Sequence, residues 1–451
     1  MTHKEITALL HSEIVPVTGC TGPTAYALAA AACRPYVTGS ILSWNVVVSP
    51  AYLKMGFGVA TPGTSRTGIG VAAAAGFIGG DASLGLQVLK NTTADDLRKA
   101  LAICDSGIIR ISAAEKETGI YVRNEMTTDH ETVTAVVRHT HDGLRLIRVG
   151  DETVYSVDPD VQEERLEDHP DLLSLDDIFS YAETCTDEET AFLEGAYRIN
   201  LALAEDGIRG GFGLKTGRAL LERTAGNAAG DLFEHPFRYL PDSVEDRINL
   251  LVCAASDARM GGSRLPASAA MGDGNQGITL LLPIGIYGES LHKPAYEITR
   301  AMAFGALMLF YVKMHIGRAA AMCMCAIAAS AGAAAGICAL RGLTRSQTEA
   351  AVKNAITPLA GMLCDGAKNA CALKMSVAVR SALQAADLAS LGVEAGYYDG
   401  ICDDSLKDTV SAVTDIANQS MDFLDSCMVQ TILQKEMRGR NSDESPERQA
   451  H

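Results

Sequence analysis

The sequence predicts an α+β protein that is mostly helical, with one antiparallel β-sheet in its N-terminal third. Three observations lead to this fold class. Aromatic residues make up only 5% of the 451 residues while glycine and alanine are abundant, a composition typical of closely packed helices. Short β-branched runs gather between residues 107 and 157, and long helical patterns dominate from about residue 174. At this length we expect two or three domains.

The predicted elements divide the chain into four parts. Residues 1–100 are expected to form helices and glycine-rich turns around one strand at 44–48, and residues 101–172 an antiparallel sheet domain with a linker. A helical domain is expected at 173–435, and the polar tail 436–451 is predicted to be disordered. The strands of the meander are β-branched runs bounded by turn residues, at 108–111, 120–123, 132–137, 144–147 and 153–155. The linker is the acidic, proline-bearing stretch 158–171.

The formal net charge of −17 argues against a nucleic-acid-binding surface, which needs a basic footprint. The first residues lack the basic and apolar layout of a signal peptide, so we expect a cytoplasmic protein whose twelve cysteines are reduced. The uncharged segment 319–340 is long enough to span a bilayer, and Gly332 and Gly336 have the spacing of a membrane helix pair. Its alanine, glycine, serine and cysteine residues transfer weakly into lipid, which favours a buried helix in a soluble bundle.

Cys20 is the first candidate catalytic residue. An alanine-rich helical run follows it, Thr21 suits the N-cap, and Pro23 suits the first helical turn. A cysteine just before a helix N-terminus is favoured as a thiolate by the exposed N–H groups and by the helix dipole. Such a thiolate can act as a base, a nucleophile or a metal ligand. The alternative is a small buried cysteine.

Four cysteines in the C-terminal half form a candidate metal site: Cys323, Cys325, Cys364 and Cys371. Three or four thiolates can hold zinc or an iron–sulfur cluster, whereas packing in the core is the alternative. On one helix, positions 364 and 371 would lie about 10 Å apart along the axis, too far for two ligands of one compact cluster. If both bind a cluster, we expect a break between them, and Gly366 allows one.

Two glycine-rich segments are candidate anion sites. Residues 272–277 match the G-x-G-x-x-G pattern, but no buried strand precedes them and residues 278–283 indicate a strand or a proline-ended apolar run, so we reject a Rossmann site. Backbone amides there can still hold a carboxylate, as can Arg259 and Arg264, whose alternative is a solvated loop face. The segment 62–68, which includes Thr64, precedes an alanine-rich helix, and its amides can likewise cradle an anion.

His139 and His141 would lie on one side of a strand. The pattern favours a polar strand end before the turn at 142–143 over a pair of metal ligands.

Together these segments resemble the L-cysteine desulfidase family, which is related to the alpha chain of iron–sulfur L-serine dehydratase. The matching stretches follow the family's order over most of the chain, at 19–23, 62–64, 256–262, 274–277, 323–336 and 361–374. The resemblance implies cleavage of L-cysteine to pyruvate, ammonia and sulfide without pyridoxal phosphate. It also implies a [4Fe–4S] cluster held by three cysteines, with one iron open to the substrate.

The resemblance also implies roles for individual residues. By position, Cys364 and Cys371 would be cluster ligands, the third ligand would be Cys323 or Cys325 with Cys323 favoured, and Cys20 would be the general base. The candidates for binding the substrate are Thr64, Arg259, Asn275 and Gln276. Elementary chemistry agrees with this division, because a thiolate suits removal of the α-proton and an open iron can act as a Lewis acid.

Alternatives remain open at this point. Gly22 and Ser263 depart from the family pattern, so serine, threonine or another β-substituted amino acid is also a candidate substrate. A pyridoxal-phosphate lyase would need a lysine, but Lys54, Lys368 and Lys374 stand in no recognisable pyridoxal-site pattern. A non-enzymatic cysteine-rich sensor or metal-binding scaffold is a further hypothesis. We expect a small amino acid as the ligand and neither nucleic acid nor membrane as a partner, and the sequence leaves room for a homo-oligomer.

Overall fold

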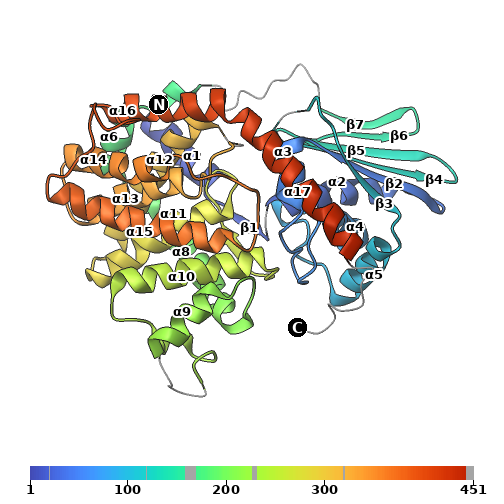
Figure 1. Ribbon diagram of the computed structural model, residues 1–451, viewed down its shortest axis with the longest axis horizontal. Coiled ribbons are helices and arrows are strands. Elements are labelled where there is room, and N and C mark those ends of the chain that lie inside the picture. The colour runs from blue at the N-terminus through green and yellow to red at the C-terminus, as the bar shows by residue number, and fades with distance from the viewer. Residues whose placement is uncertain (20, 118, 158–168, 226–230, 318–319, 443–451) are drawn as a thin grey trace.

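In the computed structural model the chain folds into two lobes, a helical lobe and a sheet lobe (Figure 1). The structure describes residues 1–19, 21–117, 119–157, 169–225, 231–317 and 320–442. The chain begins in the helical lobe with α1 (His3–Glu13), whose buried residues join the core of that lobe. It then crosses through β1 (Pro16–Thr18), which pairs with β8 (Pro266–Ser268), and builds the sheet lobe from residues 21–157. The part expected at 1–100 therefore contributes to both lobes.

The sheet lobe contains a six-stranded sheet in the order β3-β2-β4-β5-β6-β7. Its strands are β2 (Ile41–Val48), β3 (Ile109–Ala113), β4 (Tyr121–Thr128), β5 (Thr132–Arg138), β6 (Leu144–Val149) and β7 (Glu152–Ser156). All neighbouring pairs are antiparallel except β2 and β3, which are parallel. The α+β class with a sheet in the N-terminal third is confirmed. However, β3, predicted as the first strand of the meander, pairs parallel to β2 because three helices connect the two strands and return the chain to the same end of the sheet.

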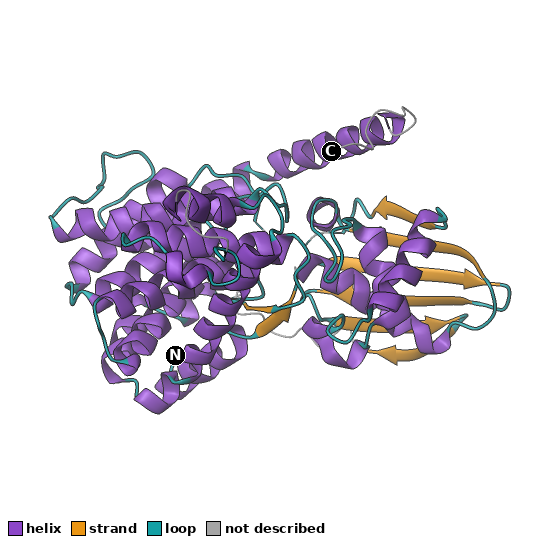
Figure 2. Cartoon of the chain, turned by 90° about the horizontal axis from the view of Figure 1, so that it is seen from below, coloured by secondary structure: helices purple, strands orange, loops and turns teal. Residues whose placement is uncertain are grey.

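Those three connecting helices are α3 (Pro50–Gly56), α4 (Ile69–Gly79) and α5 (Ala94–Asp105). One face of the sheet is covered by α4 together with α2 (Thr21–Cys33), as the second view shows (Figure 2). Alternate residues of β4 and β5 are buried against these helices, as the period of two along a strand requires. Trp44 lies in this core and donates its indole N–H to Asn124 Oδ1 at 2.7 Å. The expected strand at 44–48 and the alanine-rich helices are confirmed.

The helical lobe is built around α13 (Ile327–Leu340), of which nearly every residue is buried. Around it lie α6 (Leu175–Thr184), α7 (Asp187–Thr190), α8 (Phe192–Gly210), α9 (Thr216–Ala225), α10 (Val244–Met260), α11 (Gly274–Ser290), α12 (Ala295–Ile316), α14 (Arg345–Ile356), α15 (Cys371–Ser390) and α16 (Leu406–Asp415). A β-carbon on Gly332 would collide with the carbonyl oxygen of Gly305 in α12, so these glycines allow the two helices to approach closely. None of the helices in the described ranges is long and apolar enough to cross a bilayer.

Two predictions about the glycine- and alanine-rich segments need correction. Residues 320–326 are not part of a buried helix, since α13 begins only at Ile327, and they form a loop that carries Cys323 and Cys325. Residues 278–283, predicted as a strand or apolar run, belong to α11, which includes Pro283. Almost all of α11 is buried, so it lacks the polar face whose period of 3.6 residues identifies a helix in a sequence.

The last helix, α17 (Asp422–Ser442), leaves the helical lobe and packs against α3 of the sheet lobe (Figure 1). Val429 joins the core of the sheet lobe, so α17 connects the two lobes. The helix continues to Ser442, so the first part of the segment predicted as disordered is helical, and residues 443–451 lie outside the described residues. Most of the predicted linker, residues 158–168, also lies outside them.

Candidate active site

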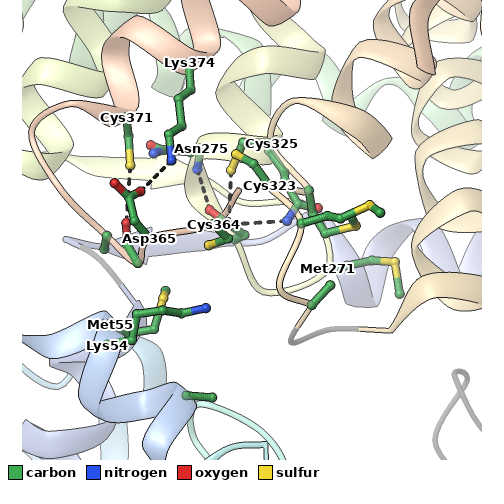
Figure 3. A pocket seen from close by; sticks show the side chains of 18 of the residues that line it. Lys54, Met55, Met271, Asn275, Cys323, Cys325, Cys364, Asp365, Cys371 and Lys374 are labelled. Atoms are coloured by element: carbon green, nitrogen blue, oxygen red, sulfur yellow. Dashed lines mark hydrogen bonds and ion pairs between the residues drawn. The ribbon is translucent and has the colours of Figure 1, made fainter. Parts of the chain in front are cut away.

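A cavity of about 110 Å³ lies where the two lobes meet. The helical lobe lines it with the loop 320–326, the loop 361–370, the first turns of α11 and α15, and side chains of α10 and α12. The sheet lobe lines it with α3, Ile120 and His141. Figure 3 shows Lys54 and Met55 of α3 on the opposite side of the cavity from the cysteines. All four cysteines of the candidate metal site line this cavity, as do Arg259, Asn275 and Gln276.

The two cysteine-bearing loops are held side by side by backbone hydrogen bonds. The Cys323 N–H donates to the Met362 carbonyl at 2.8 Å, and the Cys364 N–H donates to the Ala321 carbonyl at 2.7 Å. Met322 and Leu363 face each other in an antiparallel bridge. Residues far apart in the sequence therefore reach one cavity through a short piece of sheet-like pairing.

No continuous helix joins Cys364 to Cys371, so the helix break that the sequence analysis required of two cluster ligands is present. Cys364 lies in the loop, whereas Cys371 is the first residue of α15. Gly366 has a φ of +85°, a conformation that side chains rarely adopt, and a β-carbon there would collide with the carbonyl oxygen of Lys54. The loop is further held by Lys374, whose Nζ donates to the Leu363 carbonyl at 2.7 Å and pairs with Asp365 Oδ1 at 2.5 Å.

The cysteines differ in their electrostatic surroundings. A hydrogen bond between the two thiols lowers the pKa of Cys323 and raises the pKa of Cys325 well above its usual range. Burial raises the pKa of Cys364, and it raises the pKa of Cys371 to about 12. The Cys325 thiol also donates to Asp273 Oδ2 at 3.4 Å. Without a bound cation most of these buried groups are therefore thiols, and they would release protons on binding a metal.

The donor set fits an iron–sulfur cluster in its chemistry, because soft thiolates are the usual ligands of such clusters. Across the described ranges, no three histidine, cysteine, aspartate or glutamate side chains are arranged to hold a single metal ion. A cluster makes a different demand, since each cysteine binds a different iron atom and the sulfur atoms need not converge on one point.

Asp273 organises the part of the cavity at the N-terminus of α11. As the N-cap it accepts a hydrogen bond from the Asn275 N–H at 2.8 Å, and it also accepts one from Gln276 Nε2 at 3.3 Å. The buried guanidinium of Arg259 lies 3.5 Å from the same carboxylate. Burial alone would raise the pKa of Asp273, but the charges of Arg259 and Lys313 hold that pKa below its usual range.

The amide oxygens of Asn275 and Gln276 are buried at this end of the cavity. No hydrogen-bond donor reaches Asn275 Oδ1 or Gln276 Oε1 from the part of the chain that the structure describes. Buried acceptors of this kind are costly unless a ligand or water satisfies them. This region therefore suits a ligand that brings hydrogen-bond donors.

The sheet lobe contributes residues that the sequence did not identify as a group. The Tyr52 hydroxyl and His141 Nδ1 form a hydrogen bond, and both residues line the cavity. His139, proposed as the other member of a histidine pair, is not among the residues that line it. Tyr52 and Lys313 belong to no motif, and Asp273 stands at a variable position of the 272–277 pattern. Their roles arise from where the packing places them.

Two predicted site residues are not part of this group. Thr64 lines a second cavity of about 560 Å³, together with Arg264, Asn369 and a set of glycines. The loop that carries Thr64 is attached to the helical lobe through the Gly63 N–H, which donates to the Gly262 carbonyl at 2.8 Å. Cys20 lies outside the described residues, and α2 begins at the next residue, Thr21.

Comparison with known proteins gives a consistent result. A family model described as serine dehydratase alpha chain matches residues 83–430. A UPF0597 protein of Clostridium perfringens (strain SM101 / Type A) is 31% identical over 431 residues, which cover 96% of this chain and 98% of that protein. A UPF0597 protein of Oleidesulfovibrio alaskensis is 33% identical over 428 residues, covering 95% and 97% of the two chains. One from Photobacterium profundum is 32% identical over 427 residues, covering 94% and 96%.

Proposed function

This chain belongs to the serine dehydratase alpha chain family of dehydratase-type lyases, and we propose that it converts L-cysteine to pyruvate, ammonia and sulfide. The proposed cofactor is a [4Fe–4S] cluster rather than pyridoxal phosphate. The observation that carries this proposal is the convergence of Cys323, Cys364 and Cys371 on one cavity beside buried hydrogen-bond acceptors and cationic side chains.

Cys323, Cys364 and Cys371 are the proposed cluster ligands. Cys325 is left out because its thiol is engaged with the Asp273 carboxylate, which also interacts with Arg259. When bound, the cluster would supply a Lewis-acidic iron that polarises the substrate. Lysines are less suited to an aldimine here, because Lys368 donates to the Lys54 carbonyl and Lys374 is paired with Asp365.

The substrate would be held by groups at both sides of the cavity. Asn275 Oδ1 and Gln276 Oε1 are acceptors and suit the ammonium group of an α-amino acid. Arg259, Lys313 and Lys54 line the same cavity and provide positive charge for the carboxylate. The sequence led us to expect a carboxylate on the backbone amides of residues 272–277, whereas this proposal assigns the ammonium group to the side-chain oxygens of Asn275 and Gln276.

Cys20 remains the proposed general base, on the strength of its place directly before α2. Its thiolate would take the proton from the α-carbon of the substrate. Thr64 lines the second cavity, so we propose that it contributes to substrate binding from there rather than at the reacting atoms. We also propose a cytoplasmic location, in agreement with the eleven free cysteines among the described residues, and a homo-oligomer as the assembly.

L-Serine is the second candidate substrate, because the matching family is described as serine dehydratase. The two reactions share the α-proton and the carboxylate and differ only in the leaving group. A cysteine-rich protein that binds a cluster without turnover is the non-enzymatic alternative.

Anaerobic purification followed by iron, labile-sulfide and pyruvate analysis tests the proposal. We expect about four irons per chain, as the cluster formula requires, and pyruvate with equimolar sulfide from L-cysteine. A Cys20→Ala variant should keep its iron and lose pyruvate formation. Pyruvate from L-serine only would favour the second candidate, and an iron-loaded protein with no turnover of either amino acid would favour the binding protein. A preparation that takes up no iron under these conditions contradicts all three.

A further inference from the structure

Tyr52 and His141 form a hydrogen-bonded pair on the wall of the cavity that faces the cysteines. Tyr52 comes from α3, and His141 comes from the turn between β5 and β6, so two separate elements of the sheet lobe build the pair. Their rings lie 5.8 Å apart between centroids. Neither residue is needed by the binding roles given above.

Tyr52 is held in place by contacts with Tyr26. The Tyr26 hydroxyl donates to the carbonyl oxygen of Tyr52 at 2.5 Å, and the two rings meet edge to face at 5.7 Å. Only 3% of Tyr52 is exposed to solvent. A buried tyrosine hydroxyl placed in this way has a defined direction, which is what a proton donor needs.

His141 differs from Tyr52 because it is only half-buried. It is the one histidine among the described residues that line the cavity. Histidine is the side chain whose ordinary pKa allows proton exchange with water near neutral pH. The pair therefore connects solvent, through a half-buried imidazole and a buried hydroxyl, to the cavity.

We propose that Tyr52 is the acid that protonates the departing sulfur and that His141 resupplies its proton. This inference rests on the proposed elimination reaction and adds a second proton-transfer group to it. In the imidazolium form both ring nitrogens are donors, so Nδ1–H of His141 donates to the Tyr52 oxygen and leaves the hydroxyl proton directed elsewhere.

The base takes the α-proton, the electron pair of that C–H bond forms the Cα–Cβ double bond, and the Cβ–S bond breaks with its electron pair on sulfur. The departing hydrosulfide takes the Tyr52 proton and leaves as hydrogen sulfide. Tyr52 then takes the Nδ1 proton of His141, and water restores the proton on the imidazole. The organic product is 2-aminoacrylate, which hydrolyses to pyruvate and ammonia.

The Tyr52→Phe variant tests this with substrates whose leaving groups differ in basicity: L-serine, L-cysteine and 3-chloro-L-alanine. Chloride leaves without being protonated. Hydrosulfide is more basic and is helped by protonation, and hydroxide, the most basic of the three, depends on it most. We expect Tyr52→Phe to lower kcat by about 100-fold with L-cysteine, the usual scale for losing a general acid, and by no more than about threefold with 3-chloro-L-alanine. Equal losses with two substrates that the wild type turns over would overturn the proposal.

The matched control is Tyr181→Phe, which removes a buried hydroxyl of the helical lobe that does not line the cavity. It should show no dependence on the leaving group. Iron content and thermal unfolding of each variant establish that the fold and the cofactor are retained. If the wild type eliminates nothing from any of the three substrates, the proposed function fails rather than the role of Tyr52.

A second measurement applies if the wild type accepts only one substrate. His141→Ala should lose activity and regain at least about tenfold on addition of imidazole, because a free imidazole can replace the missing proton carrier. Sodium chloride at the same ionic strength should restore nothing. Iron-loaded His141→Ala protein that imidazole does not rescue would contradict the relay.

Discussion

Lys368 donates a hydrogen bond from Nζ to the carbonyl oxygen of Lys54 at 3.0 Å, and this bond joins the two lobes beside the cysteines. Lys368 lies in the loop between Cys364 and Cys371, and Lys54 lies on α3 of the sheet lobe. Lys368 also forms a bridge with Gly58, the second residue after the end of α3. The loop that would hold a cluster is therefore shaped in part by the opposite lobe.

Replacing Lys368 by methionine should weaken this connection and make the bound iron easier to remove. Methionine keeps most of the length of the side chain but cannot donate, and a hydrogen bond from a charged group contributes about 1.5–3 kcal/mol. We expect the rate of iron loss to a chelator to rise about tenfold, measured anaerobically by absorbance. Lys407→Met, at an exposed lysine on α16, is the control and should lose iron at the wild-type rate.

Gly366→Ala should disturb the cysteine loop more than an alanine at a comparable glycine elsewhere. The methyl group would meet the carbonyl oxygen of Lys54, and the φ of +85° adds strain of about 1–3 kcal/mol. Gly400 has a similar φ of +77°, and a methyl group added there would meet no atom within 4 Å, so Gly400→Ala isolates the cost of the backbone. Chemical unfolding of both variants should show the larger loss for Gly366→Ala. Equal losses would show that the loop moves aside freely.

Single alanine substitutions should separate the two cysteines of the loop 320–326. Cys323→Ala is expected to abolish cluster binding, because it removes one of the three proposed ligands. Cys325→Ala is expected to keep iron and to alter the surroundings of Asp273 only. The measurement is iron per chain after anaerobic reconstitution, with Cys104→Ala on α5 as the control. The reverse result for Cys323 and Cys325 would exchange their assigned roles.

Asp257 should make the stability of the protein depend on pH between about 4 and 6. Burial raises the pKa of this carboxyl to about 6, although the backbone N–H of Gly217 opposes the change with a 3.0 Å hydrogen bond. The ordinary pKa is about 3.9, so the folded protein binds the proton more tightly than the unfolded chain does. The contribution of Asp257 to the free energy of unfolding is therefore greatest below pH 4. It falls as the pH rises through 6 and is constant at higher pH.

Between pH 4 and pH 6 the free energy of unfolding should fall by about 3 kcal/mol, since each pKa unit corresponds to about 1.4 kcal/mol. Asp257→Asn removes the titrating group, so we compare its unfolding free energy with that of the wild type at several pH values. The difference between the two proteins should shift in favour of the variant as the pH rises from 4.5 to 7.5. A difference that stays constant over this range would mean that Asp257 is not protonated on folding.

The elements that the sequence predicted well are those with a local cause. The strands β4 to β7 follow β-branched runs, and the capped helices follow their apolar faces. The break near Gly366 was predictable because a glycine stood between two cysteines too far apart on a helix. The parallel pairing of β3 could not be predicted, since an apolar strand carries no signal for the direction of its partner. The helix α11 was missed because a fully buried helix shows no amphipathic period.

The sequence by itself determined which residue types can carry the chemistry: the four cysteines of the candidate metal site, Arg259, and the amides of Asn275 and Gln276. Only the tertiary structure decided which of them share a cavity, which of their polar atoms are buried without donors, and that Thr64 lies in a different cavity. It also brought in Tyr52, His141, Lys54 and Asp273, which no spacing connects to the cysteines. The physical reason is that residue type depends on the local sequence, whereas burial and proximity depend on the packing of two lobes whose contacting segments lie hundreds of residues apart.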